Sequence, residues 1–209
     1  MHVTTINRRL SVNRFNQRRL HGLINQLFND YSKLLVVRVD FYLKSEYAEI
    51  NTYDYMNQAF TRLRNNLRFN RLFEYYITYA AKLEYGQDRK WHYHVLFFFN
   101  GQKIKNDYLL ALAIGRYWTE TIVKGLGDFY SANMNKGRYR WVGVGMIEYH
   151  DIHKRMALMM CADYLVKDDS GTQLAIHDVA SKTYRSYRQG LYKPRVTGLG
   201  RPREYRFNK

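Results

Sequence analysis

The stretch LEYGQDRKWHYHVLFFFN, from Leu83 to Asn100, contains two runs of aromatic and β-branched residues separated by a polar segment with a glycine. Such runs favour strands, and the segment from Gly86 to Lys90 has the composition of a turn, so the stretch predicts a β-hairpin. The first strand of this hairpin extends back to Glu74, and the second begins at Trp91 with two histidines one residue apart.

His92 and His94 point to one face of the predicted strand, because side chains two residues apart share a face. Glu84, on the partner strand, can add a third ligand. A loop with an odd number of residues places Glu84 opposite His92 on that face, whereas an even loop without a bulge turns it away. Two imidazoles and a carboxylate suit Mg²⁺ or Mn²⁺, although the ligand types also permit zinc. The alternative is a pair of half-exposed strand histidines that bind no metal.

A helix is predicted from about His153 to Lys167, with Asp151 as its cap. Tyr164 and Lys167 are three residues apart and therefore share a face of this helix. A tyrosine attacks a phosphodiester as the phenolate, and since its ordinary pKa is about 10, a nearby ammonium group would help it. The pair is a candidate nucleophile with its electrostatic partner. Alternatively, Tyr164 packs on the sheet as an ordinary helix residue.

The remaining patterns predict further helices and strands around the hairpin. We expect one or two helices within residues 5–32, a buried strand over 34–43, a helix over 53–72, a helix from Asn106 or Asp107 to about Lys124 and, after a Gly/Asn-rich loop, a strand over 139–150. This order predicts an α+β fold with a central antiparallel β-sheet of about five strands flanked by helices.

We divide the chain into an N-terminal helical segment, residues 1–33, one α+β domain, residues 34–181, and a basic, aromatic-rich C-terminal tail, residues 182–209. The tail alternates cations with aromatic rings, which suits either a DNA-contacting arm or a solvated end. The candidate DNA-binding residues are Arg38, Arg185, Arg188, Lys193 and Arg195.

The charge of the chain predicts a polyanionic partner. Its 209 residues include 34 lysines and arginines against 18 acids, a formal charge of +16, and nucleic acid is the first candidate. The 20 tyrosines and 11 phenylalanines suit stacking on single-stranded bases, or simply form an aromatic core. Neither a lipidation signal nor a membrane-spanning apolar run is present, so we expect a soluble protein without a membrane partner. With Cys161 as the sole cysteine, no internal disulfide or thiolate zinc cage can form, which fits a reducing cytoplasm.

Taken in order, the strand LLVVRVDFYL, Glu84, the HYH motif of His92 to His94 and the helical YLVK motif around Tyr164 resemble the HUH endonuclease superfamily, in its Rep branch. This branch contains rolling-circle replication initiators. The resemblance covers residues 34–168. Relaxases of the superfamily usually carry the tyrosine before the histidines, whereas here it follows them. The basic, tyrosine-rich chain is also similar to replication proteins of inoviruses and enterobacterial prophages.

The resemblance implies an RRM-like or ferredoxin-like sheet and a role for each motif residue. His92, His94 and Glu84 would bind a divalent ion, Mg²⁺ or Mn²⁺, and residues 34–181 would form the endonuclease domain. Tyr164 would attack single-stranded DNA at a replication origin, leaving a 5′-phosphotyrosine link and a free 3′-OH, while Lys167 steadies the phosphate or the metal site.

The partners implied are a separate host helicase, because no G-x-x-x-x-G-K-[ST] motif occurs, and a polymerase. Met160 and Asp168 occupy the predicted helical-turn positions beside Tyr164, so this resembles a one-tyrosine enzyme that acts in the bacterial cytoplasm. The resemblance allows a homodimer. The rival interpretations are a single-tyrosine transposase of the same superfamily, a non-catalytic RRM-like binder of single strands and a packaging protein. Second-rank site candidates are Asp40, Arg38, Glu148 and His150.

Overall fold

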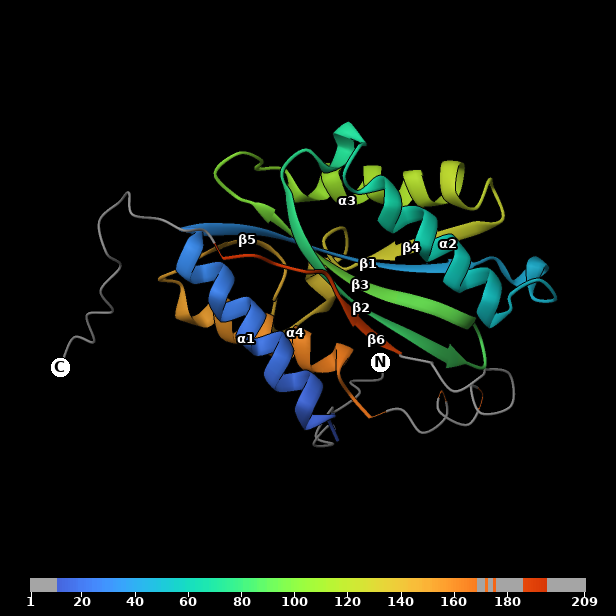
Figure 1. Cartoon of the computed structure of the whole chain (residues 1–209), viewed down its shortest axis with the longest axis horizontal. Helices are drawn as coiled ribbons and strands as arrows, with labels where there is room; N and C mark the ends of the chain where they lie inside the picture. Colours follow the sequence, from blue (N-terminus) through green and yellow to red (C-terminus); the bar gives the residue numbers. More distant parts are fainter. Residues whose placement is uncertain (1–10, 169–171, 173–174, 176–185, 195–209) are drawn as a thin grey trace.

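The computed structural model describes residues 11–168, 172, 175 and 186–194, which form one antiparallel sheet with helices on both faces (Figure 1). The helices are α1 (Arg14–Asp30), α2 (Tyr53–Asn66), α3 (Asp107–Arg116) and α4 (Ile152–Leu165). The strands are β1 (Lys33–Leu43), β2 (Tyr76–Gly86), β3 (Lys90–Asn100), β4 (Gly127–Ser131), β5 (Gly145–Glu148) and β6 (Tyr187–Gln189). The predicted α+β class is confirmed, with six strands in place of about five.

The sheet has the strand order β4-β1-β3-β2-β6, and β5 pairs with the amino-terminal half of β1 beside β4. The segment from β1 to β4 alternates as β-α-β-β-α-β, with α2 and α3 as the two connections. This is the ferredoxin-like arrangement, in which each helix links two strands that have a third strand between them. It puts β1 and β3 at the centre, where both are paired on each side.

Two hydrophobic cores form because the side chains of each strand alternate between the faces of the sheet. Figure 1 shows α2 and α3 covering one face, and α1 and α4 covering the other. The first core includes the β3 residues Trp91, Tyr93, Val95, Phe97 and Phe99. The second includes Leu96 and Phe98 of β3 together with apolar residues of α1 and α4. The alternation along β3 therefore separates the two histidines from Trp91 and Tyr93.

The helices begin at polar capping residues, as the sequence predicts for two of them. The side chains of Asn13, Thr52, Asn106 and Asp151 each accept a hydrogen bond from a backbone N–H in the first turn of α1, α2, α3 and α4. Among the described residues, none of these helices has both the length and the apolar character needed to cross a bilayer.

Several predicted boundaries differ from the structure. β4 lies in the segment that we expected to be a Gly/Asn-rich loop. Its five residues are too few to show a strand pattern beside the neighbouring glycines, so the sequence did not predict it. The strand predicted over 139–150 is reduced to β5, since the backbone at Gly143 lies against α4, where a Cβ would overlap the carbonyl of Ala157. α2 ends at Asn66 instead of Leu72, and α3 continues to Ile122 only as a π-helical segment. β6 falls in the segment that we separated as a tail.

Two helical glycines give a matched test of the packing. A Cβ on Gly115 would overlap the Phe129 ring, whereas a Cβ on the exposed Gly22 meets nothing within 4 Å. We expect Gly115→Ala to lower the free energy of unfolding by about 1–3 kcal/mol through overpacking. Gly22→Ala should raise it by about 0.5–1 kcal/mol, because alanine loses less backbone entropy in a helix. Urea unfolding measures both, and equal effects of the two substitutions would contradict the packing of α3 on β4.

Candidate active site

The face of the sheet that α1 and α4 cover becomes charged towards the β2–β3 hairpin. On the three neighbouring strands β1, β3 and β2, successive residues on this face change from apolar to ionisable. They are Leu34, Val36, Arg38 and Asp40 on β1; Phe98, Leu96, His94 and His92 on β3; and Ala80, Lys82 and Glu84 on β2. The charged residues of this series are largely buried. Burial of ionisable groups is unfavourable unless they are paired, so their contacts define the site.

The strand register brings these side chains into one group. Gly86 pairs with Lys90 and leaves three residues between them, which is the odd length that places Glu84 directly opposite His92. His94 lies between Asp40 on β1 and Lys82 on β2. Opposite residues of antiparallel strands have neighbouring Cβ atoms, so the register alone sets these contacts.

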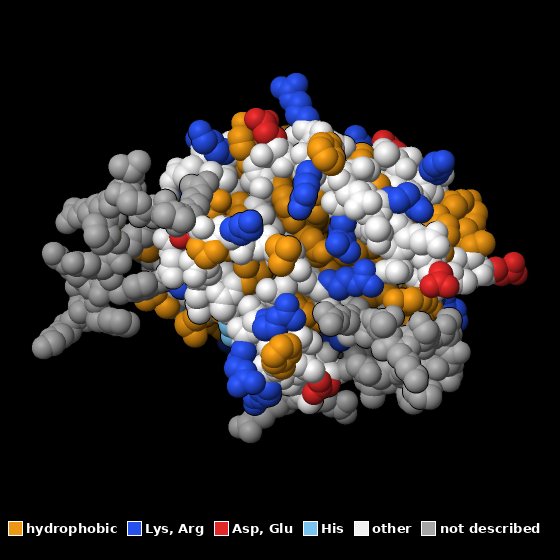
Figure 2. Space-filling view, viewed as in Figure 1, with side chains coloured by type: hydrophobic (Ala, Val, Ile, Leu, Met, Phe, Trp, Pro, Cys, Tyr) orange, Lys and Arg blue, Asp and Glu red, His pale blue; other side chains and the backbone are white. Residues whose placement is uncertain are grey.

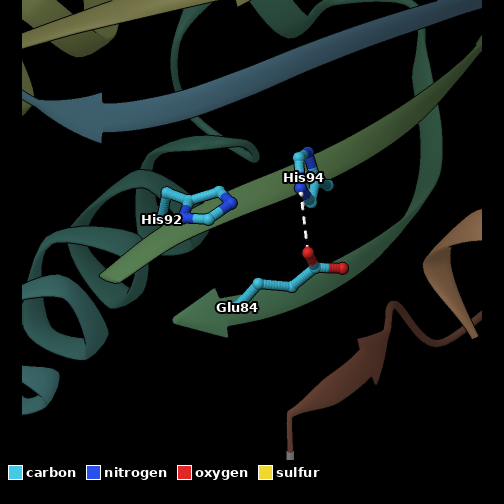
Figure 3. Close-up of side chains that lie close together, drawn as sticks. All are labelled: Glu84, His92 and His94. Atoms are coloured by element: carbon cyan, nitrogen blue, oxygen red, sulfur yellow. Dashed lines mark ion pairs between the residues drawn. The ribbon is translucent and has the colours of Figure 1, made fainter. Parts of the chain in front are cut away.

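Glu84, His92 and His94 form the candidate metal-binding group. One potential ligand atom from each lies within 4.8 Å of the other two, and all three residues are buried. Figure 3 shows the two imidazoles rising from β3 beside the carboxylate of β2, with the ion pair between His94 and Glu84 drawn. Two imidazole nitrogens and a carboxylate oxygen are suitable ligands for Mn²⁺ and related divalent ions, and a set of three leaves further coordination positions open.

Each histidine has a partner for the ring nitrogen that would not bind metal. His94 Nδ1 lies 2.8 Å from Asp40 Oδ1, and His92 Nδ1 lies 3.0 Å from the carbonyl oxygen of Lys90. A proton on each Nδ1 leaves the Nε2 lone pairs available, which is the usual arrangement for metal-binding histidines. Arg38 Nη2 also lies 3.4 Å from His94 Nδ1, but the shorter contact with Asp40 assigns the proton to that nitrogen.

Two buried atoms of this group have no hydrogen-bond partner among the described residues: Glu84 Oε1 and His94 Nε2. His94 Nε2 is 3.4 Å from Glu84 Oε2, within ion-pair distance but without hydrogen-bond geometry. Leaving a buried polar atom unpaired is unfavourable by about 1–3 kcal/mol. A cation bound by Glu84, His92 and His94 would satisfy both atoms, so these residues fit a metal ion.

The two buried acids remain ionised because cations surround them. Burial opposes the charge on Glu84, but His94 and Lys167 lower its pKa to about 2. Burial also opposes the charge on Asp40, but His94 and Arg38 hold its pKa well below the usual range. Arg38 Nε lies 3.2 Å from Asp40 Oδ1, and Lys167 Nζ lies 3.0 Å from Glu84 Oε2. Both acids are therefore available as carboxylates near neutral pH.

The two histidines have opposite pKa shifts. Burial and the charge of His94 lower the pKa of His92, which favours the neutral imidazole that binds metal. Burial acts in the same direction on His94, but Asp40 and Glu84 outweigh it and raise its pKa. A proton on His94 Nε2 and a metal ion would compete for one lone pair, so metal binding should release a proton.

Tyr164 lies next to this group at His94, near the end of α4. Its ring centroid is 5.4 Å from that of His94, and the two rings meet edge to face. Lys167 Nζ is 4.1 Å and Arg38 Cζ is 4.8 Å from the centroid of the same ring. Burial opposes the charge on Lys167, but Glu84 and Tyr164 raise its pKa. The candidate nucleophile is thus half-buried between two cations and beside a candidate metal ligand.

The other sequence-predicted residues lie in several places. Arg38 is inside the site, with a side chain only 12% exposed, instead of on an open DNA-binding surface. Arg188 is on β6 and alternates to the opposite face of the sheet from Tyr187, whereas Lys193 is exposed. Arg185 and Arg195 lie outside the described residues.

Glu148 and His150 are not part of the site. Glu148 pairs with Lys33, at the end of β1 away from Asp40, and contacts His150 at 3.2 Å on an exposed surface. Asp40, in contrast, occupies a central position in the site, although the sequence analysis made it only a second-rank site candidate.

Two further residues of the site have no counterpart in the sequence prediction. Lys82 is 4% exposed, and its Nζ donates to the carbonyl oxygen of Lys167 at 3.3 Å. Tyr130, on β4, pairs with Asp40 on the neighbouring strand. Strand alternation from Glu84 could have indicated Lys82. Tyr130 had no such signal because β4 itself was not predicted.

Metal binding can be tested by thermal unfolding. Mn²⁺ at about 100 times its dissociation constant should raise the Tm by about 5–10 °C, because only the folded chain assembles the ligands. We expect His92→Ala to abolish this shift, and His150→Ala, which removes an exposed histidine, to keep it. The site assignment would be wrong if both variants responded to Mn²⁺ like the unaltered protein.

The family model of the YagK/YfjJ C-terminal domain matches residues 2–178 of the 209. No curated protein and no solved structure gives a significant match. The match spans most of the chain and includes Glu84, His92, His94, Tyr164 and Lys167. The chain therefore belongs to the YagK/YfjJ C-terminal domain family, a family of prophage-associated proteins.

Proposed function

We propose that this protein is a HUH-type endonuclease that nicks single-stranded DNA through a covalent link to Tyr164 and so initiates rolling-circle replication of a phage or prophage. The observation that carries the proposal is the placement of the Tyr164 ring 5.4 Å from His94 and 4.1 Å from the Lys167 ammonium group. A phenol beside a group of two imidazoles and a carboxylate is an arrangement that can support nucleophilic attack on a phosphodiester.

The proposed reaction exchanges one phosphodiester for another. The Tyr164 oxygen forms a bond to phosphorus as the bond from phosphorus to the 3′ oxygen breaks. The phenolic proton is balanced by the proton that the departing 3′-OH acquires, so neither nucleotide hydrolysis nor a redox partner is needed. The products are a 5′-phosphotyrosine and a free 3′-OH that can prime synthesis.

The surrounding residues have separate tasks in this reaction. Glu84, His92 and His94 would hold a divalent ion, Mg²⁺ or Mn²⁺, which supplies positive charge to the phosphate oxygens when bound. Asp40 keeps His94 in the tautomer that exposes Nε2. Lys167 lies near both Glu84 and the Tyr164 ring and favours negative charge on the phenol.

The distribution of charge supports a nucleic-acid substrate. Figure 2 shows lysine and arginine side chains spread over the visible face, with sparse acids between them. With a formal charge of +16, the chain should bind the phosphate backbone with an affinity that falls steeply as salt increases.

Membership of a prophage-associated family fits the part of the proposal that assigns the protein to a phage or prophage. A separate helicase, supplied by the bacterial host, would then unwind the duplex, and a polymerase would extend the 3′-OH. Met160 lies one helical turn before Tyr164, and Asp168 lies beyond the end of α4 at Leu165, so neither position adds a second tyrosine. Closure of the product would use a second subunit or another hydroxyl group.

The test is formation of a covalent adduct with single-stranded DNA from the replication region of the encoding element. In the presence of Mn²⁺, the protein should give a complex that survives denaturing electrophoresis. Tyr164→Phe should abolish the complex while DNA affinity stays within about threefold, because only one hydroxyl is lost. Tyr108→Phe, which alters an exposed tyrosine on α3, is the matched control and should keep the adduct.

Other outcomes separate the rival functions. An adduct that persists in Tyr164→Phe would show that the nucleophile lies elsewhere. Recovery of strands joined to new target sites would favour a transposase. DNA binding without an adduct under any metal condition would contradict the nuclease proposal and leave a non-catalytic binder of single strands.

A further inference from the structure

A cavity of about 710 Å³ opens on the opposite side of the same hairpin from the histidine pair. Tyr85 and Trp91 face each other across β2 and β3, one residue away from Glu84 and His92, so they point to the other face of the sheet. The volume lies within the range of about 300–1,000 Å³ that is typical of small-molecule pockets. The residues that line the cavity include Asn51, Tyr53, Tyr85, Gly86, Lys90 and Trp91.

Aromatic rings form the walls of this cavity. The Trp91 ring lies 5.0 Å from the Tyr85 ring and 5.6 Å from the Tyr53 ring, centroid to centroid. Trp91 is only 4% exposed and is fixed by the core, whereas Tyr85 is 37% exposed and presents a ring to solvent. A planar ligand that stacks on Tyr85 would therefore reach a rigid apolar wall.

Asn51 gives the cavity a hydrogen-bond acceptor without a partner. Its Nδ2 donates to the carbonyl oxygen of Arg89 at 3.0 Å, which fixes the orientation of the amide. Its Oδ1 is buried, and no described residue donates to it. The side chain is 7% exposed, so an unmet acceptor here is unfavourable. An N–H group of a ligand would complete it, and the pairing edge of every DNA base carries one.

The cavity approaches the candidate metal-binding group at Gly86, from the other face of the sheet. Gly86 lines it, and a Cβ on Gly86 would lie 3.6 Å from His92 Cε1. Lys90, at the rim, has its ammonium group 5.9 Å from the centre of the Tyr85 ring, and no acid occurs among the described lining residues. A strand with a phosphate at His92 can thus pass over the turn and place a neighbouring base in the cavity.

We propose that this cavity receives one unstacked base of single-stranded DNA, from a nucleotide next to the phosphate held at Glu84, His92 and His94. The inference rests on the proposed function in taking single-stranded DNA as the ligand. Stacking on Tyr85 and a hydrogen bond to Asn51 Oδ1 bind the base, and every DNA base can make both interactions.

The experiment separates binding of bases from binding of phosphates. Affinity is measured in Mn²⁺, so that the proposed metal site can hold the phosphate, with Tyr164→Phe protein, which we expect not to cleave, for a mixed-sequence oligodeoxynucleotide of about 16 nucleotides. A fully abasic oligonucleotide of equal length and charge gives the contribution of the backbone alone. The ratio of the two affinities measures how much the bases contribute to binding.

Adding Tyr85→Ala should lower this ratio by about fivefold or more, because base stacking on one aromatic side chain is worth at least that factor. Asn51→Ala should also lower the ratio, and both variants should keep their affinity for the abasic strand. Tyr108→Ala is the control and should leave the ratio unchanged. An unchanged ratio in both cavity variants would overturn the proposal.

Photo-crosslinking provides a second measurement that needs no cavity variant. An oligonucleotide carrying 5-iododeoxyuridine should crosslink to a peptide that contains Tyr85 or Trp91, and crosslinks confined to other peptides would contradict the proposal. Nicking that persists while the affinity ratio is insensitive to Tyr85 would overturn only the cavity assignment. Lack of binding to either oligonucleotide would overturn the cavity assignment and the proposed function together.

Discussion

The contact of 2.8 Å between His94 Nδ1 and Asp40 Oδ1 is the interaction on which the rest of the site depends. It joins the two central strands across the β1–β3 register and fixes which nitrogen of His94 faces Glu84. Without Asp40, the imidazole could rotate or exchange tautomers, and Nε2 would no longer be held beside the carboxylate. Arg38, on the same strand, forms an ion pair with Asp40, and Lys167, just after α4, forms one with Glu84. The charged groups thus compensate one another in a buried position where none would be stable alone.

The division of one sheet face into an apolar and a charged part explains how a helix residue reaches the site. α4 packs on the apolar part through Leu158, Ala162 and Leu165, and its last turn reaches the charged part. Tyr164 is consequently held near His94 by packing interactions that are independent of the ionisable groups. The opposite face, covered by α2 and α3, contributes the aromatic rings of the hairpin, so one β-hairpin presents the candidate metal ligands on one side and aromatic rings on the other.

Much of this arrangement could be predicted from local sequence patterns, and the remainder depends on strand pairing. Alternation along β3 is enough to place His92 and His94 on one face, and the odd hairpin loop is enough to bring Glu84 to them. The order of the strands is not encoded locally, so Asp40 could not be separated from Glu148 until β1 was seen to pair with β3 at His94 and with β5 at its far end. The five-residue β4 and the three-residue β6 have too little periodicity to predict, and both are held by pairing with longer strands.

Anomalous diffraction from crystals soaked in Mn²⁺ tests the central claim most directly, because it locates the ion without reference to activity. The account predicts a single strong peak at the hairpin end of the sheet, within bonding distance of Glu84, His92 Nε2 and His94 Nε2 and below the Tyr164 ring. Well-ordered crystals with no peak at that position, or with manganese bound only by other acids, would contradict it.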